Sequence, residues 1–291
     1  MAVGGVELCY QLDGSRGDPL VLLVNGLGGQ LIGWREGFLA ALLERGVQVL
    51  RFDNRDAGLS TSFDGAPGFD ADVARRRDRD AVAYTLDDMA DDAAGLLEAL
   101  DIAAAHVVGV SMGGMIAQTL AIRRPDLVRS LCSIMSMTGA DGVGTPTETA
   151  MAVLMRPPST DRAGYVAAQL DSHRVLGSPS FPTAPEVVAE RAGVEYDRSF
   201  RPEGTARQLM AILVSGDRTE ALASVAAPTV VIHGDADQLI TPGGAEATAA
   251  AVPGARLVMI AGMGHELPEG TWDQVADEIV ANVRRGEGAS R

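Results

Sequence analysis

The sequence contains no lysine, and all 24 of its basic residues are arginine. Without a lysine amine the chain cannot form a Schiff base with pyridoxal phosphate, and it lacks the lysine of a phosphate-binding P-loop. Cysteine is nearly absent as well: only Cys9 and Cys132 are present, each in an apolar run. We expect both to be small core side chains, with a disulfide or a reactive thiol as the lesser alternative.

Histidine is also scarce. The four histidines are scattered along the chain, without the close spacing to cysteine, carboxylate or another histidine that a metal site requires. They are His106, His173, His233 and His265. The sequence therefore predicts no metal site.

The chain has fewer basic than acidic residues, 24 against 39, and its net charge is −15. Long-range repulsion opposes binding to nucleic acid or to an anionic membrane, so neither is expected as a partner. Residues 1–10 lack the basic and apolar segments of a signal peptide. No apolar run approaches the roughly 20 residues that cross a bilayer. We expect a cytoplasmic protein, whose oligomeric state the sequence does not indicate.

Short apolar runs alternate with helical patterns along most of the chain. This alternation predicts an α/β fold with a mostly parallel central sheet and helices on both faces. Strands are expected at 5–12, 19–24, 47–52, 106–110, 127–134, 229–232 and 256–260, and helices near 33–45, 85–100, 111–123, 243–251 and 272–284.

The alternation stops between residues 136 and 215, where prolines are frequent and no apolar strand stands out. We expect an inserted helical lid, or cap, at 136–215, and a core formed by 1–135 and 216–291. Methionine adapts to irregular ligands, so the methionines in and beside the lid could line an apolar acyl pocket, although ordinary core packing explains them equally well. These are Met135, Met137, Met151 and Met155.

Ser111 stands between Gly109 and Gly113 in the pattern Gly-x-Ser-x-Gly, where an apolar strand meets a helix. A Cβ at either glycine would clash in so tight a turn, and the serine would be pushed outward. It would then lie at the carboxyl end of a strand, the edge where open α/β sheets bind ligands. Taken alone, the pattern fits an ordinary turn equally well.

A serine hydroxyl becomes a nucleophile when a base is within hydrogen-bond reach and a carboxylate orients that base. Asp237 follows the strand at 229–232 and His265 follows the strand at 256–260, so both belong to the same sheet edge as Ser111. The chain order Ser, Asp, His is the order expected for this architecture. These three residues are the predicted catalytic group.

Other residues are weaker candidates. Asp235 is the alternative acid, but it lies closer to the strand end, where capping a turn is natural. His233 ends a strand and His106 begins one at the opposite end of the sheet, so structural roles are expected. His173 is interpreted as a surface or lid residue.

Acyl transfer also needs N–H donors aimed at the developing oxyanion. The main-chain N–H of Met112, directly after the nucleophile, is one predicted substrate-binding donor. The other is the N–H of Leu27, in the flexible loop Asn25–Gly29 after an early strand.

Together these segments resemble the α/β-hydrolase-fold serine hydrolases, in family order over nearly the whole chain outside the lid. Within that superfamily the chain is similar to bacterial carboxylesterases near the aclacinomycin methylesterases, through Arg51–Thr61 and Gly262–Pro268. Many members have His-Gly where this chain has Asn25-Gly26, which puts the usual support of that loop in doubt. The segments that carry the wider resemblance are 25–29, 51–61, 109–114, 234–237 and 262–265.

The resemblance implies a cofactor-free hydrolysis. Ser111 would attack the carbonyl of a small-molecule ester, small to medium in size and including methyl esters, and water activated through His265 would release the acyl group. Family members that open epoxides or displace halides use an aspartate nucleophile instead. Three other uses of the same group stay open: thioester hydrolysis, cofactor-free haloperoxidase or perhydrolase chemistry, and carbon–carbon hydrolysis. A non-catalytic ligand-binding protein is the alternative from a different class.

Overall fold

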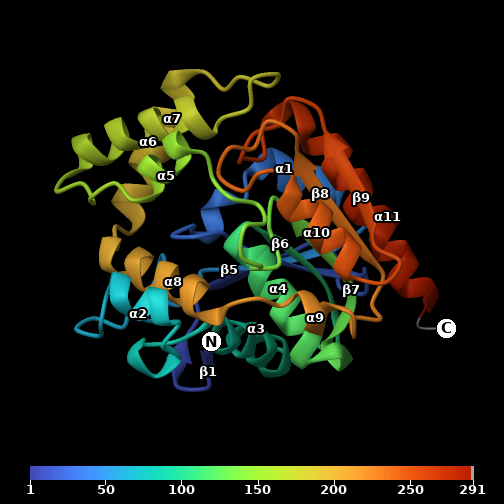
Figure 1. Ribbon diagram of the computed structural model, residues 1–291. Coiled ribbons are helices and arrows are strands. Elements are labelled where there is room, and N and C mark those ends of the chain that lie inside the picture. Colours follow the sequence, from blue (N-terminus) through green and yellow to red (C-terminus); the bar gives the residue numbers. More distant parts are fainter. Residues whose placement is uncertain (290–291) are drawn as a thin grey trace.

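The computed structural model describes residues 1–289, and within them a seven-stranded sheet has the order β3-β5-β4-β6-β7-β8-β9 (Figure 1). The edge strand β3 is antiparallel to β5, and the other neighbours are parallel. The predicted mostly parallel sheet is confirmed. The strands are β3 (Tyr10–Asp13), β4 (Leu20–Val24), β5 (Gln48–Phe52), β6 (Ala105–Val110), β7 (Val128–Ile134), β8 (Thr229–Gly234) and β9 (Arg256–Ile260).

The central strand β4 shows why the sheet is covered on both faces. Its side chains alternate between two buried clusters, with Leu22 and Val24 in one and Val21 and Leu23 in the other. A strand buried on both sides reads as a continuous apolar run because neither face meets water. The first cluster is completed by α3 (Leu86–Ala99) and α4 (Met112–Arg123), the second by α1 (Glu36–Leu43) and α11 (Trp272–Ala289).

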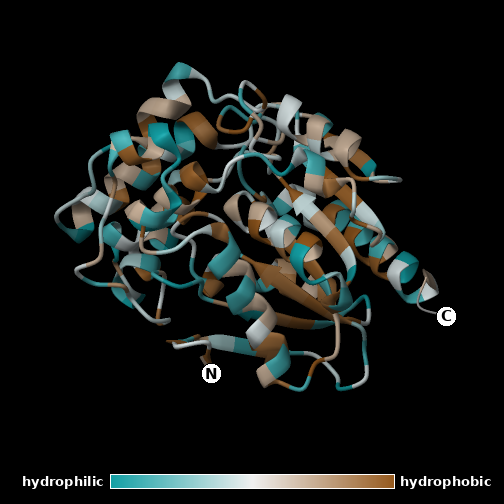
Figure 2. Cartoon of the chain, turned by 60° about the horizontal axis from the view of Figure 1, so that its bottom comes forward, coloured by the Kyte–Doolittle hydropathy of each residue, from teal (hydrophilic) through white to brown (hydrophobic). Residues whose placement is uncertain are grey.

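The remaining helices lie around this helix-covered sheet. Figure 2 shows hydrophobic residues concentrated in the sheet strands, and hydrophilic ones recurring along the surrounding helices. No helix within residues 1–289 is long and apolar enough to cross a membrane. These helices are η1 (Leu31–Gly33), α2 (Ala71–Arg76), η2 (Arg79–Ala81), η3 (Pro125–Leu127), α5 (Glu148–Leu154), α6 (Arg162–Leu176), α7 (Pro185–Arg198), α8 (Pro202–Ser215), α9 (Thr219–Leu222), α10 (Gly243–Ala251) and η4 (Glu269–Thr271).

The expected first strand at 5–12 is wrong. Residues Gly4 and Gly5, with φ of 50° and 93°, form a two-residue turn between β1 (Ala2–Val3) and β2 (Val6–Glu7), and only then does β3 begin. Two successive positive φ angles suit glycine and close an antiparallel hairpin. The chain therefore reaches the sheet about five residues later than the apolar pattern suggested.

The two cysteines differ in their surroundings. Cys132 is buried in the second core cluster, as expected. Cys9 is only half-buried, because it precedes the edge strand, and its Sγ lies 3.6 Å from the guanidinium of Arg198. Both are free thiols.

Residues 136–215 contain helices α5 to α8 and no strand. Figure 1 shows α5, α6 and α7 gathered at one side above the sheet edge, while α8 lies lower, beside α2. Helix α8 also packs against α3. The division into a core and a lid at these boundaries stays a prediction, and we keep the name lid for residues 136–215.

Candidate active site

Ser111 occupies the sharp turn between β6 and α4. Its backbone has φ 55° and ψ −121°, a conformation that a residue with a side chain rarely adopts and that surrounding structure must hold in place. The Ser111 N–H donates to the carbonyl of Ile134 at 2.9 Å, and the Ser136 hydroxyl donates to the Ser111 carbonyl at 2.8 Å. The strained turn is thus fixed by the end of β7 and by Ser136, two residues beyond it.

The two flanking glycines are required by contact distance. A Cβ at Gly109 would lie 2.0 Å from the Gly113 carbonyl oxygen, and a Cβ at Gly113 would lie 2.1 Å from the Val24 carbonyl oxygen. Both neighbours are backbone atoms that cannot turn away. The steric reason inferred from the sequence therefore holds at both positions.

Ser111, His265 and Asp237 form a continuous chain of contacts. The His265 Nε2 lies 3.0 Å from the Ser111 Oγ, and its Nδ1 lies 2.7 Å from the Asp237 Oδ2. A carboxylate only accepts, so Nδ1 carries the proton and donates to Asp237. This leaves the Nε2 lone pair to accept from the Ser111 hydroxyl, which is the arrangement a general base needs.

Asp237 is buried and held by its other oxygen. Its Oδ1 accepts from the N–H groups of Leu239 and Ile240 at 2.8 and 3.0 Å. The neighbouring His233 has its Nε2 2.7 Å from the Ile240 carbonyl and 3.4 Å from the Asp237 Oδ2. Burial holds the pKa of His233 below its usual value, against the opposing charge of Asp237. A neutral His233 therefore packs against Asp237 and donates to the Ile240 carbonyl, which leaves the Asp237 carboxylate to His265.

The weaker candidates lie elsewhere. Asp235 accepts from the Gly262 N–H at 2.6 Å and so caps the turn that precedes the His265 loop. His106 lies at the start of β6, 2.9 Å from the Ser130 Oγ and 3.1 Å from Glu287, at the opposite end of the sheet. His173 belongs to α6 and does not contact Ser111 or Asp237; its Nδ1 lies 3.4 Å from a Glu266 carboxylate oxygen.

The His265 loop is held by the end of α6, a contact that sequence patterns did not reveal. The His265 N–H donates to the Leu176 carbonyl at 2.8 Å, and the Gly264 N–H donates to the Ser178 hydroxyl at 2.9 Å. A Cβ at Gly264 would lie 2.4 Å from the Gly177 carbonyl oxygen. The absence of a side chain at Gly264 therefore lets the His265 loop pack closely against the lid, in addition to allowing the conformational freedom expected from the sequence.

Two main-chain N–H groups near Ser111 are available as hydrogen-bond donors to a ligand. Within residues 1–289, neither the Leu27 N–H nor the Met112 N–H has a hydrogen-bond acceptor in the protein. The adjacent Gly28 N–H, in contrast, donates to the Gln208 Oε1 at 2.8 Å. Gly26 lies directly against the serine, since a Cβ there would be 3.2 Å from the Ser111 Cβ. Open donors at this place suit a developing oxyanion.

Asn25, which departs from the pattern of the resembled superfamily, supports this loop. It is buried, its Nδ2 donates to the Phe52 carbonyl at 3.3 Å, and its own carbonyl accepts from the Asn54 Nδ2 at 3.1 Å. Gln208 of α8, which accepts from the Gly28 N–H of the loop, also donates from its Nε2 to the Arg55 carbonyl at 2.7 Å. The loop is therefore braced from β5 and from the lid.

A family model with the description "alpha/beta hydrolase fold" matches residues 19–269. The chain belongs to this family. The α/β-hydrolase fold expected from the sequence is therefore confirmed.

Individual relatives of this α/β hydrolase include two methylesterases. The chain is 29% identical to rhodomycin D methylesterase DauP from Streptomyces sp. (strain C5), with 93% of each chain covered. It is 26% identical to rhodomycin D methylesterase DnrP from Streptomyces peucetius, again with 93% of each covered. The crystal structure of the enol-lactonase from Burkholderia xenovorans LB400 superposes with a TM-score of 0.76 at 26% identity, covering 98% of this chain and 99% of that one. The methylesterase resemblance is confirmed.

The serine side of this hydrolase's site opens into a mostly apolar cavity of about 310 Å³ lined by both Ser111 and Leu27. Of the four methionines considered from the sequence, Met137 and Met151 line it. Met135 is instead buried in the core, and Met155 is exposed outside the cavity. Sequence patterns missed several other apolar lining residues: Met115, Leu154, Leu209, Ile212, Leu213, Leu239 and Ile240.

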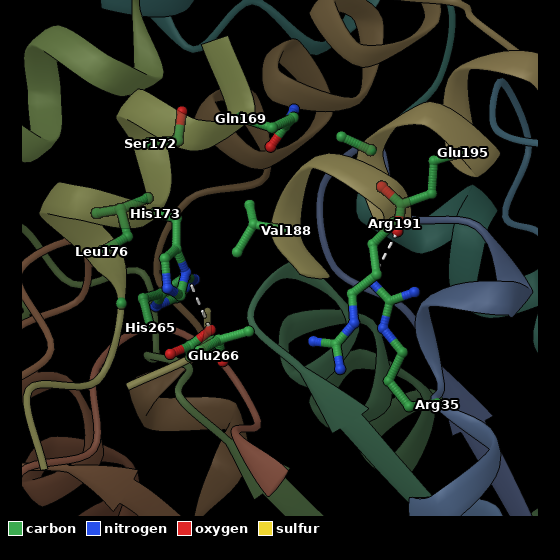
Figure 3. Close-up of a pocket in the computed structure, with 13 residues that line it drawn as sticks. Arg35, Gln169, Ser172, His173, Leu176, Val188, Arg191, Glu195, His265 and Glu266 are labelled. Atoms are coloured by element: carbon green, nitrogen blue, oxygen red, sulfur yellow. Dashed lines mark hydrogen bonds and ion pairs between the residues drawn. The ribbon is translucent and has the colours of Figure 1, made fainter. Parts of the chain in front are cut away.

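The histidine side opens into a second, polar cavity of about 210 Å³ (Figure 3). It is lined by His265 and by charged residues that come from three separate segments. Because these segments are far apart in the sequence, no local pattern predicted the cavity. The charged and titratable residues are Arg35, His173, Arg191, Glu195 and Glu266.

Proposed function

We propose that the protein is a serine carboxylesterase that hydrolyses small to medium carboxylic esters, methyl esters included. The observation that carries this proposal is the continuous contact from the Ser111 Oγ through His265 to Asp237, at 3.0 and 2.7 Å, beside a cavity. Three side chains from different strand ends meet in the order that nucleophilic catalysis requires.

In the first half of the reaction, the Ser111 Oγ bonds to the ester carbonyl carbon while its proton passes to the His265 Nε2. The carbonyl electron pair moves onto oxygen, and in this proposal the N–H groups of Leu27 and Met112 stabilise it. The carbon–oxygen bond to the alcohol then breaks as the alcohol oxygen takes the proton from Nε2. An acyl-serine remains.

In the second half, water gives its proton to the His265 Nε2 and attacks the acyl carbon. Collapse of this intermediate releases the carboxylic acid and returns the proton to the Ser111 oxygen. Asp237 keeps Nδ1 protonated and stabilises the imidazolium that forms in both halves. No cofactor takes part in any of these steps.

We prefer ester hydrolysis to the other reactions that Ser111, His265 and Asp237 could catalyse, because DauP and DnrP are named methylesterases. The apolar cavity leaves room for a group beside a carbonyl at Ser111, and the polar cavity lies beside His265. Thioester hydrolysis, perhydrolysis and carbon–carbon hydrolysis would use the same nucleophile and base. A non-catalytic binding protein would have no need of the aligned histidine and carboxylate.

The test is hydrolysis of p-nitrophenyl acetate, butyrate and octanoate by the parent protein, Ser111→Ala and Ser224→Ala. Ser224 is exposed and hydrogen-bonds only its own turn, so it controls for the purification and for loss of a hydroxyl. We expect turnover by the parent and by Ser224→Ala, and loss of nearly all activity in Ser111→Ala. Activity that survives in Ser111→Ala would overturn the mechanism, and inactivity of the parent would favour the binding-protein alternative.

A further inference from the structure

The polar cavity contains one charged side chain without a partner. Arg191, from α7, lines the cavity and is half-buried. Within residues 1–289 its side chain makes no hydrogen bond and no ion pair. A guanidinium carries five N–H donors, and those of Arg191 are available to a ligand in the cavity.

The other charges of the cavity are already engaged. Arg35 pairs with Glu195 at 2.9 Å. Glu266 accepts from the Ser178 N–H at 2.8 Å with one oxygen and lies 3.4 Å from the His173 Nδ1 with the other. Figure 3 shows Arg191 beside Arg35 on one side of the cavity, across from His265 and Glu266. Neither glutamate is therefore free to neutralise Arg191.

The electrostatic setting of Arg191 matches this geometry. Burial, and then the like charge of Arg35, hold the pKa of Arg191 below its ordinary value, even though Glu266, Glu269 and Glu195 act in the opposite direction. Arginine stays protonated at neutral pH despite such a shift. Arg191 therefore presents to the cavity an unpaired positive charge that an incoming anion would stabilise.

We propose that the polar cavity is a subsite for a carboxylate carried by the substrate, and that Arg191 recognises it. Resting on the proposed function, this narrows the substrate class to esters with a carboxylate on one side of the ester and an apolar group on the other. A guanidinium binds a carboxylate with two parallel hydrogen bonds. His265 lines the same cavity, so an occupant held by Arg191 lies beside the base that acts on the ester.

Arg218 in the apolar cavity shows what a structural arginine looks like in this fold. Burial lowers the pKa of Arg218 to about 10. Its donors, however, are used within the protein, on the Gln118 side chain at 3.2 Å and on the carbonyls of Gly216 and Met137 at 3.2 and 3.0 Å. The N–H donors of the Arg191 side chain have no acceptor in the described part of the protein, and we therefore assign them to a bound ligand.

The experiment compares monohexyl glutarate with its neutral carboxamide analogue, and 4-(hexanoyloxy)butanoate with its carboxamide, so that both ester orientations are covered. Binding is measured calorimetrically to Ser111→Ala, which cannot consume the ester by the proposed route. The same measurement is made with Arg191→Gln, Arg191→Lys and Arg162→Gln added to Ser111→Ala. Arg162 is the matched control, since it is a lid arginine that pairs with Asp197 at 2.8 Å outside the cavity.

We expect the carboxylate of at least one pair to bind about tenfold more tightly than its amide, the gain typical of a charge-assisted contact. Arg191→Gln should abolish this preference, Arg191→Lys should retain part of it, and Arg162→Gln should leave it intact. Equal binding of acid and amide, no binding of either, or a preference that survives Arg191→Gln would overturn the proposal.

Turnover by the parent protein separates this proposal from the esterase proposal. If the amides are hydrolysed and no carboxylate preference exists, the subsite is wrong and the esterase stands. If the carboxylates bind through Arg191 but no ester is hydrolysed, the subsite stands and the esterase is wrong.

Discussion

The main-chain N–H of His265 donates to the carbonyl oxygen of Leu176 at 2.8 Å. This bond joins the loop that holds the base to the last residue of α6, a helix of the lid. The position of the imidazole therefore depends on the lid as well as on the sheet, and changes at this contact should affect rate more than stability.

Gly264→Ala tests that dependence. The new Cβ would lie 2.4 Å from the Gly177 carbonyl oxygen and 2.5 Å from that of Leu176, so the His265 loop must shift. We expect kcat/KM for p-nitrophenyl butyrate to fall about 100-fold, in line with a displacement of about 1 Å at a reacting group. Gly68→Ala is the control, because nothing lies within 4 Å of its added Cβ. Full activity of Gly264→Ala would contradict the coupling.

Asp237→Asn and Asp235→Asn form a matched pair of acid-to-amide changes. An amide at 237 would no longer hold the proton on Nδ1, and kcat should fall by about 10³ to 10⁴. At 235 the amide oxygen can still accept from the Gly262 N–H, so activity should stay within about tenfold of the parent. Steady-state kinetics on p-nitrophenyl butyrate distinguishes them, and the reverse ranking would make Asp235 the acid.

Met151→Trp should shorten the acyl chains that the protein accepts. Met151 lines the apolar cavity and is 42% exposed, so a larger side chain can fill the cavity without disturbing the core. The octanoate-to-acetate ratio of kcat/KM should drop about tenfold, the lower end of the discrimination that one methylene contact provides. Met155→Trp, at a residue 45% exposed and outside the cavity, should leave the ratio unchanged. An equal change in both variants would argue against this cavity as the acyl site.

Asp56 couples stability to pH. Burial raises its pKa, but hydrogen bonds from Arg207, the Phe63 N–H and Tyr84 outweigh burial, and the pKa lies below the ordinary value of 3.8. A lowered pKa in the folded state stabilises the fold above pH 3.8, and that contribution is lost as pH falls through the lowered pKa.

Asp56→Asn should remove this contribution and leave Arg207 buried without its carboxylate. The free energy of unfolding at pH 7 should fall by about 3 kcal/mol, measured by urea denaturation, with a smaller loss on acidification than in the parent. Asp80→Asn, at an exposed carboxylate that does not pair with Arg207, is the control. An unchanged acid dependence of stability in Asp56→Asn would show that another group carries it.

Local patterns were enough for the sheet and for the residues at its edge. A short continuous apolar run such as Leu20–Val24 is typical of a strand buried on both faces, and residues that follow successive parallel strands meet at one edge. Ser111, Asp237 and His265 could therefore be proposed together although 126 and 28 residues separate them along the chain.

Contacts made by the lid could not be predicted in this way. The hydrogen bonds from the Gly28 N–H to Gln208 and from the His265 N–H to Leu176 depend on how helices dock, which no repeating pattern records. The same holds for the placing of Arg191 and Arg35 in one cavity. The methionines illustrate the same limit. Met135 and Met137 are two residues apart, yet one is core and the other lines the cavity, because the chain turns at Met135 with φ 42°.

The most direct test of the central claim is covalent labelling with diethyl p-nitrophenyl phosphate, followed by intact-protein and peptide mass spectrometry. We expect a single diethylphosphoryl adduct on Ser111 in the parent protein, none in Ser111→Ala, and labelling at least about 100-fold slower in His265→Gln, because the serine then lacks its base. An unlabelled parent protein, or an adduct on any other residue, would contradict Ser111 as the nucleophile.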